Sequence, residues 1–242
     1  MIRYEAFGKR YGEITAVEGL DLEVGAREAI ALIGPNGSGK TTTLKAALGL
    51  VKPTCGRVLV DGRDMATDGR AARARIGYLP QRLGFPEGCD AREVMHFYAK
   101  LRGSPAASID GLLARVGLSG AANRAVDGYS GGMRQRLGIA IALLGAPRVL
   151  VLDEPTAALD PSGALDVREI LAGIRADGIG VLLSSHDLAE VAALADRIAV
   201  FDGGRLKAQG TAAELARAAG VASADLEQVY RALTGAQPRL AA

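Results

Sequence analysis

The chain has 242 residues, 49% of them hydrophobic, and a formal net charge of +2 at pH 7. This length suits one large α/β domain with a substantial apolar core. The small net charge argues against the basic surface of a nucleic-acid-binding protein, so we expect no nucleic-acid partner. Aromatic residues make up only 4% and tryptophan is absent. The core must therefore be built from Val, Ile, Leu and Ala, which favours buried parallel strands.

Hydrophobic periodicity predicts an α/β body with helices in its middle. Two strands near the N-terminus alternate polar and apolar residues, as is typical of half-exposed antiparallel strands. The later strands have no polar face and alternate with helices, which indicates parallel strands joined by crossover helices. The expected strands are 2–7, 20–24, 28–33, 57–60, 76–79, 149–152, 180–184 and 198–201, and the expected helices are about 41–50, 91–101, 109–116, 131–144, 163–175 and 188–195.

We expect these elements to form one domain over residues 1–242. Residues 1–80 and 127–215 are assigned to the α/β core with its antiparallel part. Residues 81–126 carry helical periodicity without a strong strand, so they are interpreted as a helical insertion. Residues 216–242 are interpreted as an Ala-rich helical tail.

The cysteines, the N-terminus and the longest apolar stretch indicate where the chain works. Cys55 and Cys89 are the only cysteines and form no C-x-x-C pair, so we interpret them as free thiols in a reducing compartment. The first residues contain no apolar core of a signal peptide. The apolar stretch 138–152 is interrupted by Pro147 and Arg148, and it is shorter than the roughly 20 apolar residues of a spanning helix. We therefore expect a chain that is soluble on its own and reaches a membrane only through a partner.

Residues 34–41, GPNGSGKT, follow the pattern G-x-x-x-x-G-K-[ST] of a phosphate-binding loop. The glycines let successive backbone N–H groups turn toward phosphate oxygens, and the following helix adds its positive end. Lys40 supplies a charge toward the β- and γ-phosphates, and Thr41 offers its hydroxyl to Mg²⁺. A chance glycine-rich turn is the weaker interpretation between a buried strand and a helix. The predicted nucleotide-binding residues of this loop are Gly34, Asn36, Gly37, Ser38, Gly39, Lys40, Thr41 and Thr42.

An apolar run over residues 149–154, VLVLDE, ends in two carboxylates. A carboxylate at the end of a buried strand needs a cation or hydrogen-bond donors. In a P-loop protein an Asp at this place holds Mg²⁺ directly or through water, and Asp153 fits that role. Glu154 extends one residue further and is predicted to polarise the water that attacks the γ-phosphate. The alternative is a surface Asp-Glu pair that closes the strand before Pro155.

A second glycine motif, Ser130-Gly131-Gly132, opens the predicted helix that precedes the acidic strand. Exposed N–H groups, a hydroxyl and the helix dipole make such a start an anion site. Taken alone, it is equally well an ordinary helix cap with a glycine turn.

With its flanking residues, Tyr129-Ser130-Gly131-Gly132-Met133 resembles the signature motif of the ATP-binding subunits of ABC transporters. Tyr129 replaces the usual Leu and Met133 replaces the usual Gln, and both variants are familiar in the ABC-2-type exporter branch. Because the backbone amides and Ser130 carry the phosphate contact, neither change argues against ATP binding.

Other motifs of that family follow in the expected order. Tyr11 resembles the aromatic residue that stacks on adenine, and Gln81 resembles the Q-loop glutamine that reaches Mg²⁺ and the attacking water. Residues 158–160, including Asp160, resemble the D-loop, and His186 resembles the switch histidine that contacts the γ-phosphate. Singly, these residues have simpler interpretations as strand packing, loop surface or a helix cap; together and in order they indicate the family.

The resemblance covers residues 2–215 and implies a P-loop NTPase fold of the α/β class: a mostly parallel sheet, an N-terminal antiparallel β subdomain and an inserted helical subdomain. It implies an ATP hydrolase that uses ATP and Mg²⁺, the latter held by Thr41, Gln81 and Asp153. Two cassettes are expected to meet head to tail, as a homodimer or a heterodimer. Ser130, Gly131, Gly132 and Asp160 of one then face the ATP of the other.

Partners and location follow from the same resemblance. It implies integral membrane permease subunits and a cytoplasmic position, peripheral on the inner face of the cell membrane. The Gly- and Pro-rich loop 81–90 suits a moving contact with the permease. Leu83 and Phe85 are expected to be exposed there, although internal packing is equally open. The transported substrate is not encoded in this chain.

Narrower resemblances and alternatives remain at this point. Residues 225–235 resemble the closing helix of ABC-2-type exporter ATPases. Segments 97–103 and 129–138 are similar to the ATPase subunit of the transporter used in maturing the copper sites of nitrous-oxide reductase. The alternatives are soluble ABC ATPases that act in iron–sulfur cluster assembly or on nucleic acid and ribosomes. The second of these is disfavoured by a single cassette, the lack of a coiled-coil arm and little net charge.

Overall fold

The computed structural model describes residues 1–105, 108–157, 159–222 and 225–235, and the strands in these ranges form two sheets. The four-stranded sheet has the order β2-β1-β4-β5, and the six-stranded sheet has the order β10-β9-β3-β8-β7-β6. The strands are β1 (Ile2–Tyr11), β2 (Ile14–Val24), β3 (Ala29–Ile33), β4 (Cys55–Val60), β5 (Arg63–Asp64), β6 (Ile76–Leu79), β7 (Val149–Asp153), β8 (Gly180–Ser184), β9 (Arg197–Asp202) and β10 (Arg205–Gly210). The helices are α1 (Lys40–Ala47), α2 (Gly69–Arg73), α3 (Ala91–Arg102), α4 (Ile109–Arg115), α5 (Gly131–Leu143), α6 (Pro161–Ala176), α7 (Leu188–Leu194), α8 (Ala212–Ala218) and α9 (Leu226–Thr234), with short 3₁₀ turns η2 (Ser119–Ala121) and η3 (Val126–Gly128).

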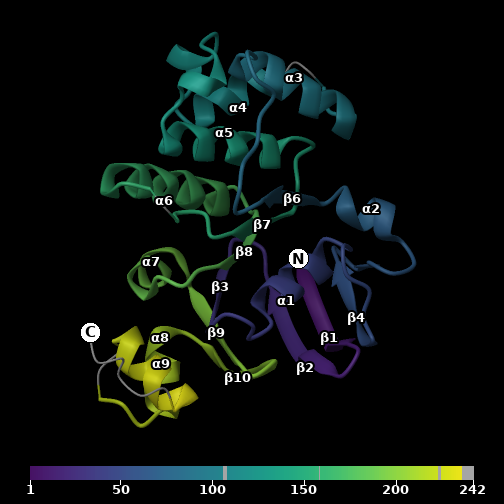
Figure 1. The fold of residues 1–242 in the computed structure, drawn as a ribbon, viewed down its shortest axis with the longest axis vertical. Coiled ribbons are helices and arrows are strands. Elements are labelled where there is room, and N and C mark those ends of the chain that lie inside the picture. The colour runs from purple at the N-terminus through teal and green to yellow at the C-terminus, as the bar shows by residue number, and fades with distance from the viewer. Residues whose placement is uncertain (106–107, 158, 223–224, 236–242) are drawn as a thin grey trace.

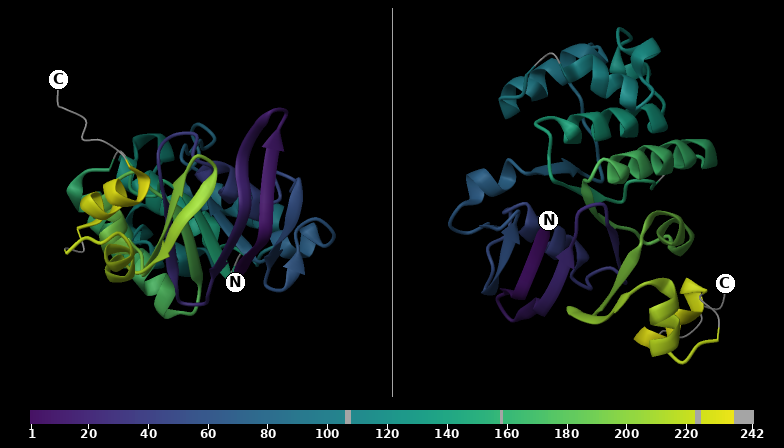
Figure 2. Two further views of the ribbon diagram at one scale, coloured as in Figure 1. Left: turned by 90° about the horizontal axis from the view of Figure 1, so that it is seen from below. Right: turned by 180° about the vertical axis from the view of Figure 1, so that it is seen from behind.

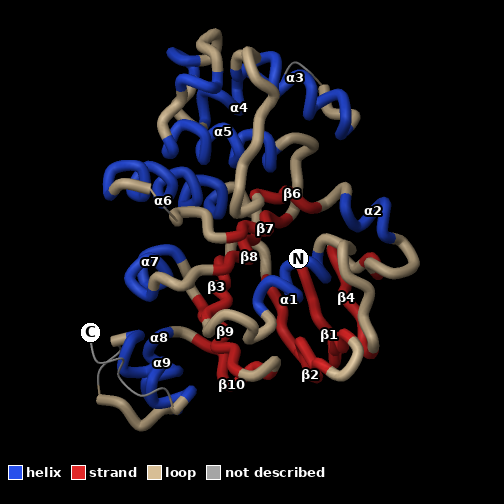
Figure 3. The backbone as a smooth tube through the Cα atoms, in the orientation of Figure 1, coloured by secondary structure: helices blue, strands red, loops and turns tan. Residues whose placement is uncertain are grey.

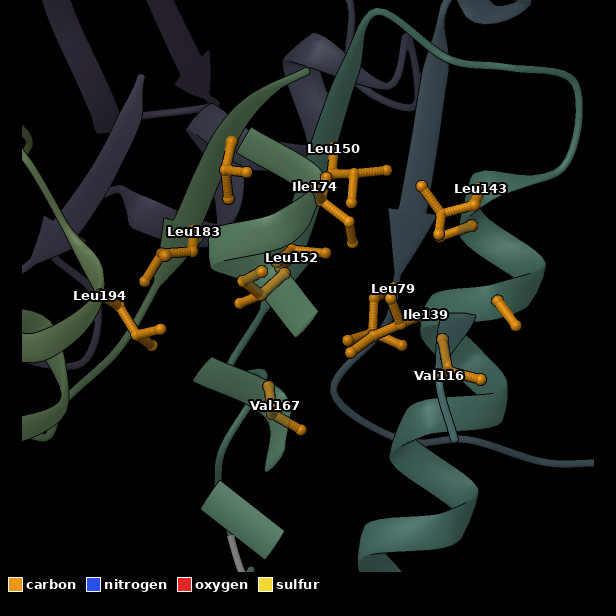
Figure 4. Close-up of a cluster of buried hydrophobic side chains, with 14 of the residues drawn as sticks. Leu79, Val116, Ile139, Leu143, Leu150, Leu152, Val167, Ile174, Leu183 and Leu194 are labelled. Carbon is orange, nitrogen blue, oxygen red and sulfur yellow. The ribbon is translucent and has the colours of Figure 1, made fainter. Parts of the chain in front are cut away.

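The six-stranded sheet is parallel except for β10, which pairs antiparallel with β9. Alternate residues of one strand enter different cores: Leu150 and Leu152 pack with α5 and α6, whereas Val149 and Val151 pack toward α1 and the smaller sheet. Figure 4 shows Leu150 and Leu152 among side chains from α5, α6 and β8. Because both faces are covered, these strands have no polar side, as the sequence predicted.

The N-terminal strands form the predicted antiparallel sheet, since β1 pairs with both β2 and β4 in antiparallel register. Both strands are longer than predicted and meet in a hairpin whose Gly12 has φ 57°. The extra residues are largely exposed, and register shifts interrupt the alternation between polar and apolar positions. The hairpin places Tyr11 at the tip of the sheet rather than inside it.

The elements lie in layers that Figures 1 and 2 show from three sides. Helices α3, α4 and α5 gather at one end, α8 and α9 lie at the other, and the smaller sheet lies beside α1. Figure 3 shows the strands in the middle of the molecule, with α3, α4 and α5 above them, α6, α7, α8 and α9 on the left and α2 on the right. The fold is therefore the predicted one: a mostly parallel sheet, an antiparallel β part and helices.

Several boundaries differ from the prediction for identifiable reasons. Helix α1 ends at Ala47 instead of residue 50, because Gly49 has φ 69° and leaves the helix. Helix α6 begins at Pro161, two residues early, because Asp160 caps it and Pro is favoured at the first helical position. Of the two alternatives left open for Leu83 and Phe85, internal packing is confirmed: both are half-buried and pack against the larger core. Elements α2, β5 and β10 were not predicted.

Two further expectations concern cysteines and membrane helices. Both cysteines are free, Cys55 exposed and Cys89 half-buried. In the described ranges, no helix is both long enough and apolar enough to cross a membrane. Ala158 of the expected D-loop and residues 223–224 and 236–242 of the expected tail lie outside the described residues.

Candidate active site

The loop between β3 and α1 requires glycine at two places. Gly39 precedes the helix in a left-handed conformation with φ 109°. A Cβ atom there would lie 2.6 Å from the carbonyl oxygen of Ala16, and one at Gly34 would lie 2.3 Å from the carbonyl oxygen of Phe201. Neither approach is possible for a larger residue, so the glycines fix the path of the loop.

Lys40 folds back over this loop. Its Nζ donates hydrogen bonds to the carbonyl oxygens of Gly34 at 2.6 Å and Pro35 at 3.1 Å. Burial lowers the pKa of Lys40, while the nearby carboxylates of Glu154 and Asp153 act in the opposite direction. The ammonium group therefore lies between the phosphate-binding loop and the acidic end of β7.

A pocket of about 320 Å³ lies in front of the loop. Besides residues 36–42 it is lined by Tyr11, Ile14 and Ala16, which form an apolar wall beside the polar loop. The Lys9 ammonium lies 4.9 Å from the centre of the Tyr11 ring. Within the described residues, the buried Ser38 hydroxyl has no hydrogen-bond partner. A cradle of N–H groups, a cation, an unpaired hydroxyl and an apolar wall together fit a nucleoside triphosphate.

The acidic end of β7 is organised by Ser184 on the neighbouring strand. The parallel register pairs Asp153 with Ser184. The Ser184 hydroxyl donates to Oδ1 of Asp153 at 2.6 Å, and the backbone N–H of Glu154 donates to the same hydroxyl at 3.2 Å. Glu154 has φ 54°, a conformation that non-glycine residues adopt at a cost and that is often found at functional sites. The two carboxylates have different partners, Ser184 for Asp153 and His186 for Glu154.

Glu154 and His186 are brought together from the ends of two strands. Oε2 of Glu154 lies 2.9 Å from Nδ1 of His186. The Glu154 side chain is only 13% exposed, whereas that of His186 is 72% exposed. Both line a pocket of about 440 Å³ together with residues of α6 and the start of α7. A carboxylate and an imidazole at this distance can orient and deprotonate a water molecule.

Gln81 lies at the same edge of the sheet. It follows β6, whose Leu79 pairs with Leu152 of β7, so Gln81 and Glu154 each lie two residues beyond this pair in their own chain segment. Its side chain is exposed. Burial, and next the charge of Asp153, raise the pKa of Tyr78 on the same strand. The proximity of β6 to the acidic strand end makes Gln81 available to a ligand bound there.

The second glycine motif lies apart from the first within the chain. Ser130 caps α5, its hydroxyl accepting from the N–H of Met133 at 3.3 Å. A Cβ at Gly131 would lie 3.8 Å from Leu159, and one at Gly132 would lie 3.5 Å from Gly163. Neither of the two pockets described above is lined by residues 130–132. One chain therefore leaves its two glycine-lined helix starts separate.

The variant residue Tyr129 is explained by packing. It is buried, its hydroxyl donates to the carbonyl oxygen of Ala121 at 2.7 Å, and burial raises its pKa. Asp160 is the N-cap of α6 and accepts from the N–H of Gly163 at 2.9 Å. The signature segment thus lies against the start of α6.

Sequence reasoning missed two residues that support the site. Ser184 ends an otherwise apolar strand two residues before His186, which is the signal that identifies it. Gln135 is buried in α5, and its Nε2 donates to the carbonyl oxygen of Pro155 at 2.6 Å. A polar residue on a helix face of buried Leu and Ile side chains is the signal for Gln135. It joins the signature helix to the segment after Glu154.

A phosphate-binding loop behind one strand and a carboxylate pair at the end of a neighbouring parallel strand define a P-loop nucleotide-binding site. Comparison with known proteins gives the family. The family model described as ABC transporter matches residues 17–157. The chain belongs to the ABC transporter family, as an ATP-binding, ATP-hydrolysing cassette of the transport type.

Individual relatives agree with this assignment. A daunorubicin resistance ATP-binding protein of Streptomyces coeruleorubidus is 41% identical over 86% of this chain and 67% of its own length. The Nod factor export ATP-binding protein I of Ralstonia nicotianae is 38% identical over 89% of this chain and 68% of its own length. A methionine import ATP-binding protein of Caulobacter vibrioides is also 38% identical, over 89% and 68%. The chain thus spans about two thirds of the length of these relatives.

Solved structures have the same fold. The ATP-binding subunit of an ABC transporter superposes with a TM-score of 0.87 at 29% identity, over 96% of this chain and 99% of the other. A dimeric ATP-binding cassette in a post-hydrolysis state, bound to ADP and Pi, has a TM-score of 0.76 at 26% identity, over 87% of this chain and 98% of the other.

Proposed function

We propose that this chain works as a dimer of ATP-binding cassettes attached to integral membrane permease subunits, on the cytoplasmic face of the membrane. The observation that carries the ATPase role of each cassette is the contact between Glu154 and His186 beside a phosphate-binding loop. The names of the relatives, which include resistance, export and import proteins, support attachment to a transporter. The homodimer and the heterodimer are both compatible with the chain.

The nucleotide is bound by the loop and the hairpin tip. The backbone amides of residues 36–42 and the ammonium of Lys40 contact the phosphates, and the free hydroxyl of Ser38 adds a donor. Tyr11 stacks on the adenine, because its ring forms the apolar wall of the same pocket. Lys40 exchanges its carbonyl partners for phosphate oxygens when the nucleotide enters.

A magnesium ion fits the residues at the edge of the sheet. Thr41, Asp153 and Gln81 offer a hydroxyl, a carboxylate and an amide oxygen, which are the hard donors that Mg²⁺ prefers beside substrate phosphates. When bound, the ion neutralises negative charge on the β- and γ-phosphate oxygens. Ser184 holds Asp153 in place for this role through its hydroxyl.

Hydrolysis is assigned to Glu154 and His186. Glu154 accepts a proton from the water whose oxygen attacks the γ-phosphorus, while the bond from that phosphorus to the β-phosphate oxygen breaks. ADP and inorganic phosphate are the products. His186 holds the Glu154 carboxylate through Nδ1 and presents its exposed ring edge to the γ-phosphate.

The second chain completes the site. Ser130, Gly131, Gly132 and Asp160 of one cassette face the nucleotide of the other, which agrees with their absence from the lining of the nucleotide pocket in their own chain. Loss of the γ-phosphate removes the charge shared by the two helix starts, so the dimer loosens after hydrolysis. The dimeric solved structures of related cassettes support the proposal that two chains associate.

The narrower assignment is export through an ABC-2-type permease. Relatives in daunorubicin resistance, Nod factor export and lantibiotic transport support this branch. Segments 97–103 and 129–138 support the further proposal that the permease serves copper-site maturation of nitrous-oxide reductase. Deleting the gene for this chain should then yield nitrous-oxide reductase that lacks copper; fully loaded reductase would refute that proposal alone.

The test of the proposed function uses Glu154→Gln in the full chain. ATP binding should be retained, phosphate release should fall by at least about a hundredfold, and ATP should hold the protein as a dimer in size-exclusion chromatography. Glu169→Gln, an exposed change on α6, is the control and should behave as the unmodified chain. Full turnover by the Glu154 variant would refute the proposed role.

A further inference from the structure

An ion pair joins α6 to α7 inside the pocket that contains Glu154 and His186. Nε of Arg168 donates to Oε2 of Glu190 at 3.1 Å, and Nη2 of Arg168 donates to Oε1 of the same carboxylate. Glu190 is only 14% exposed and Arg168 30%. A two-point contact of this kind fixes both the separation and the relative orientation of the helices.

The position of His186 depends on where α7 begins. Its ring is exposed, and in the described part of the chain the ring forms no hydrogen bond or ion pair other than that with Glu154. The backbone on its N-terminal side is held by the sheet, where the N–H of Ser185 donates to the carbonyl oxygen of Leu32. On its other side, Asp187 caps α7, accepting from the N–H groups of Ala189 and Glu190. The first turn of α7 therefore sets the place of His186.

Helix α7 has only seven residues, of which Val191 and Leu194 are buried. Helix α6 has 16 residues and buries Val167, Leu171 and Ile174 against the sheet. Glu190 lies in the first turn of α7, the turn that follows His186 directly. Because Arg168 donates two hydrogen bonds to Glu190, helix α6 supports the first turn of α7. That turn follows His186 in the chain.

We propose that Arg168 and Glu190 are positioning residues that hold the start of α7 against α6 and thereby keep His186 within hydrogen-bond distance of Glu154. This inference rests on the roles proposed for Glu154 and His186. The pair acts on the hydrolytic step and leaves nucleotide binding unchanged, because neither residue lines the pocket in front of the phosphate-binding loop.

The chain offers a matched control on the same two helices. Arg175 of α6 forms an ion pair with Asp196 and donates to the carbonyl oxygen of Leu194 at the far end of α7. Loss of Arg175 weakens the same helix packing without touching the turn beside His186. A merely structural role for Arg168 would be shared by Arg175, whereas a positioning role would not.

The kinetic test compares Arg168→Gln, Glu190→Gln and Arg175→Gln in the full chain with ATP and Mg²⁺. The first two changes should lower kcat by about tenfold and leave KM for ATP unchanged, since a small misplacement of a reacting group costs rate more than binding. Arg175→Gln should keep kcat. The exchange Arg168→Glu with Glu190→Arg should recover part of the lost rate. Unchanged kcat in the first two variants, or an equal loss in the Arg175 variant, would overturn the inference.

A spectroscopic test reports His186 directly. The chain has two histidines, His96 and His186, so nitrogen-15 labelled histidine gives a simple spectrum in which the exposed His96 on α3 is an internal reference. Arg168→Gln should move the His186 nitrogen signals toward those of a Glu154→Ala protein and leave His96 in place. Unmoved His186 signals would contradict the positioning role.

The two hypotheses fail in different ways. If His186→Ala and Glu154→Gln keep full turnover, the proposed function of the site is wrong. If those variants lose turnover while the Arg168 and Glu190 variants keep it, only the positioning role is wrong.

Discussion

Nδ1 of His186 lies 2.9 Å from Oε2 of Glu154, although 32 positions separate the two residues in the chain. Their strands, β7 and β8, are neighbours in the sheet, and each side chain follows the end of its strand. The parallel pairing of the two strands therefore brings the pair together, since each residue lies just beyond the end of its strand. Four predictions follow from this arrangement and from the groups around it.

The histidine is expected to act on turnover. His186→Ala should lower kcat by about a hundredfold while ATP affinity changes little, because the ring lies outside the pocket in front of the phosphate-binding loop. Phosphate release under single-turnover conditions and equilibrium nucleotide binding measure the two quantities. His96→Ala, an exposed change on α3, should leave both unchanged. A variant with normal kcat and much weaker ATP binding would contradict this role.

Removing either of two buried hydroxyl groups should affect the free energy of unfolding differently, because one is hydrogen-bonded and the other, within the part of the chain that the structure describes, is not. Ser184→Ala removes the donor to Asp153 and the acceptor for the N–H of Glu154, so the free energy of unfolding should fall by about 1–3 kcal/mol. Thr43→Val removes a buried hydroxyl that has no hydrogen-bond partner among the described residues. It should leave the protein equally stable or stabilise it by up to about 1 kcal/mol. Urea unfolding without nucleotide measures the free energy of unfolding of both variants. An equal loss of stability in the two variants would refute the role given to the Ser184 hydroxyl.

The phosphate-binding loop should not tolerate a side chain at Gly39. In Gly39→Ala the new Cβ would meet the carbonyl oxygen of Ala16 at 2.6 Å with φ at 109°, and a strained backbone of this kind costs about 1–3 kcal/mol. The loop must shift, so ATP affinity should fall at least about tenfold. Gly173→Ala in α6 meets nothing within 4 Å and should stabilise the chain by about 1 kcal/mol. Titration with a fluorescent ATP analogue and thermal unfolding give the two results.

Lys40 should show a conflict between stability and function. Burial lowers its pKa, so the folded chain disfavours the charged ammonium relative to the unfolded chain. Lys40→Met should therefore raise the melting temperature of the nucleotide-free protein and also abolish most ATP binding. The penalty on the ammonium is fully present below the folded pKa and disappears as pH rises through the ordinary value of 10.5. The difference in melting temperature between Lys40→Met and the unmodified chain should therefore shrink as the pH rises toward 10.5. A difference that grows with pH would refute the assignment of this effect to the buried ammonium group.

The phosphate-binding loop and the buried strands could be predicted from the sequence, because short runs of consecutive residues define them. The phosphate-binding loop is a run of consecutive residues, so its glycines, Lys40 and Thr41 are recognisable without any partner. The buried strands were identified because both of their faces are apolar, and packing on two sides requires this. Predictions were poorer where a neighbour decides the structure: α6 starts early because Asp160 caps it, and Leu83 and Phe85 are covered by the core.

The sequence by itself determined which groups exist and at which strand ends they lie: a cation and a hydroxyl after one strand, two carboxylates after another, a histidine after a third. Only the tertiary structure decided which of them meet. The parallel register sets Asp153 beside Ser184, and the turn at Glu154 aims its carboxylate at His186. The packing of α7 on α6 brings Glu190 to Arg168. Such contacts depend on the alignment of distant segments in space, and spacing along the chain does not encode that alignment locally.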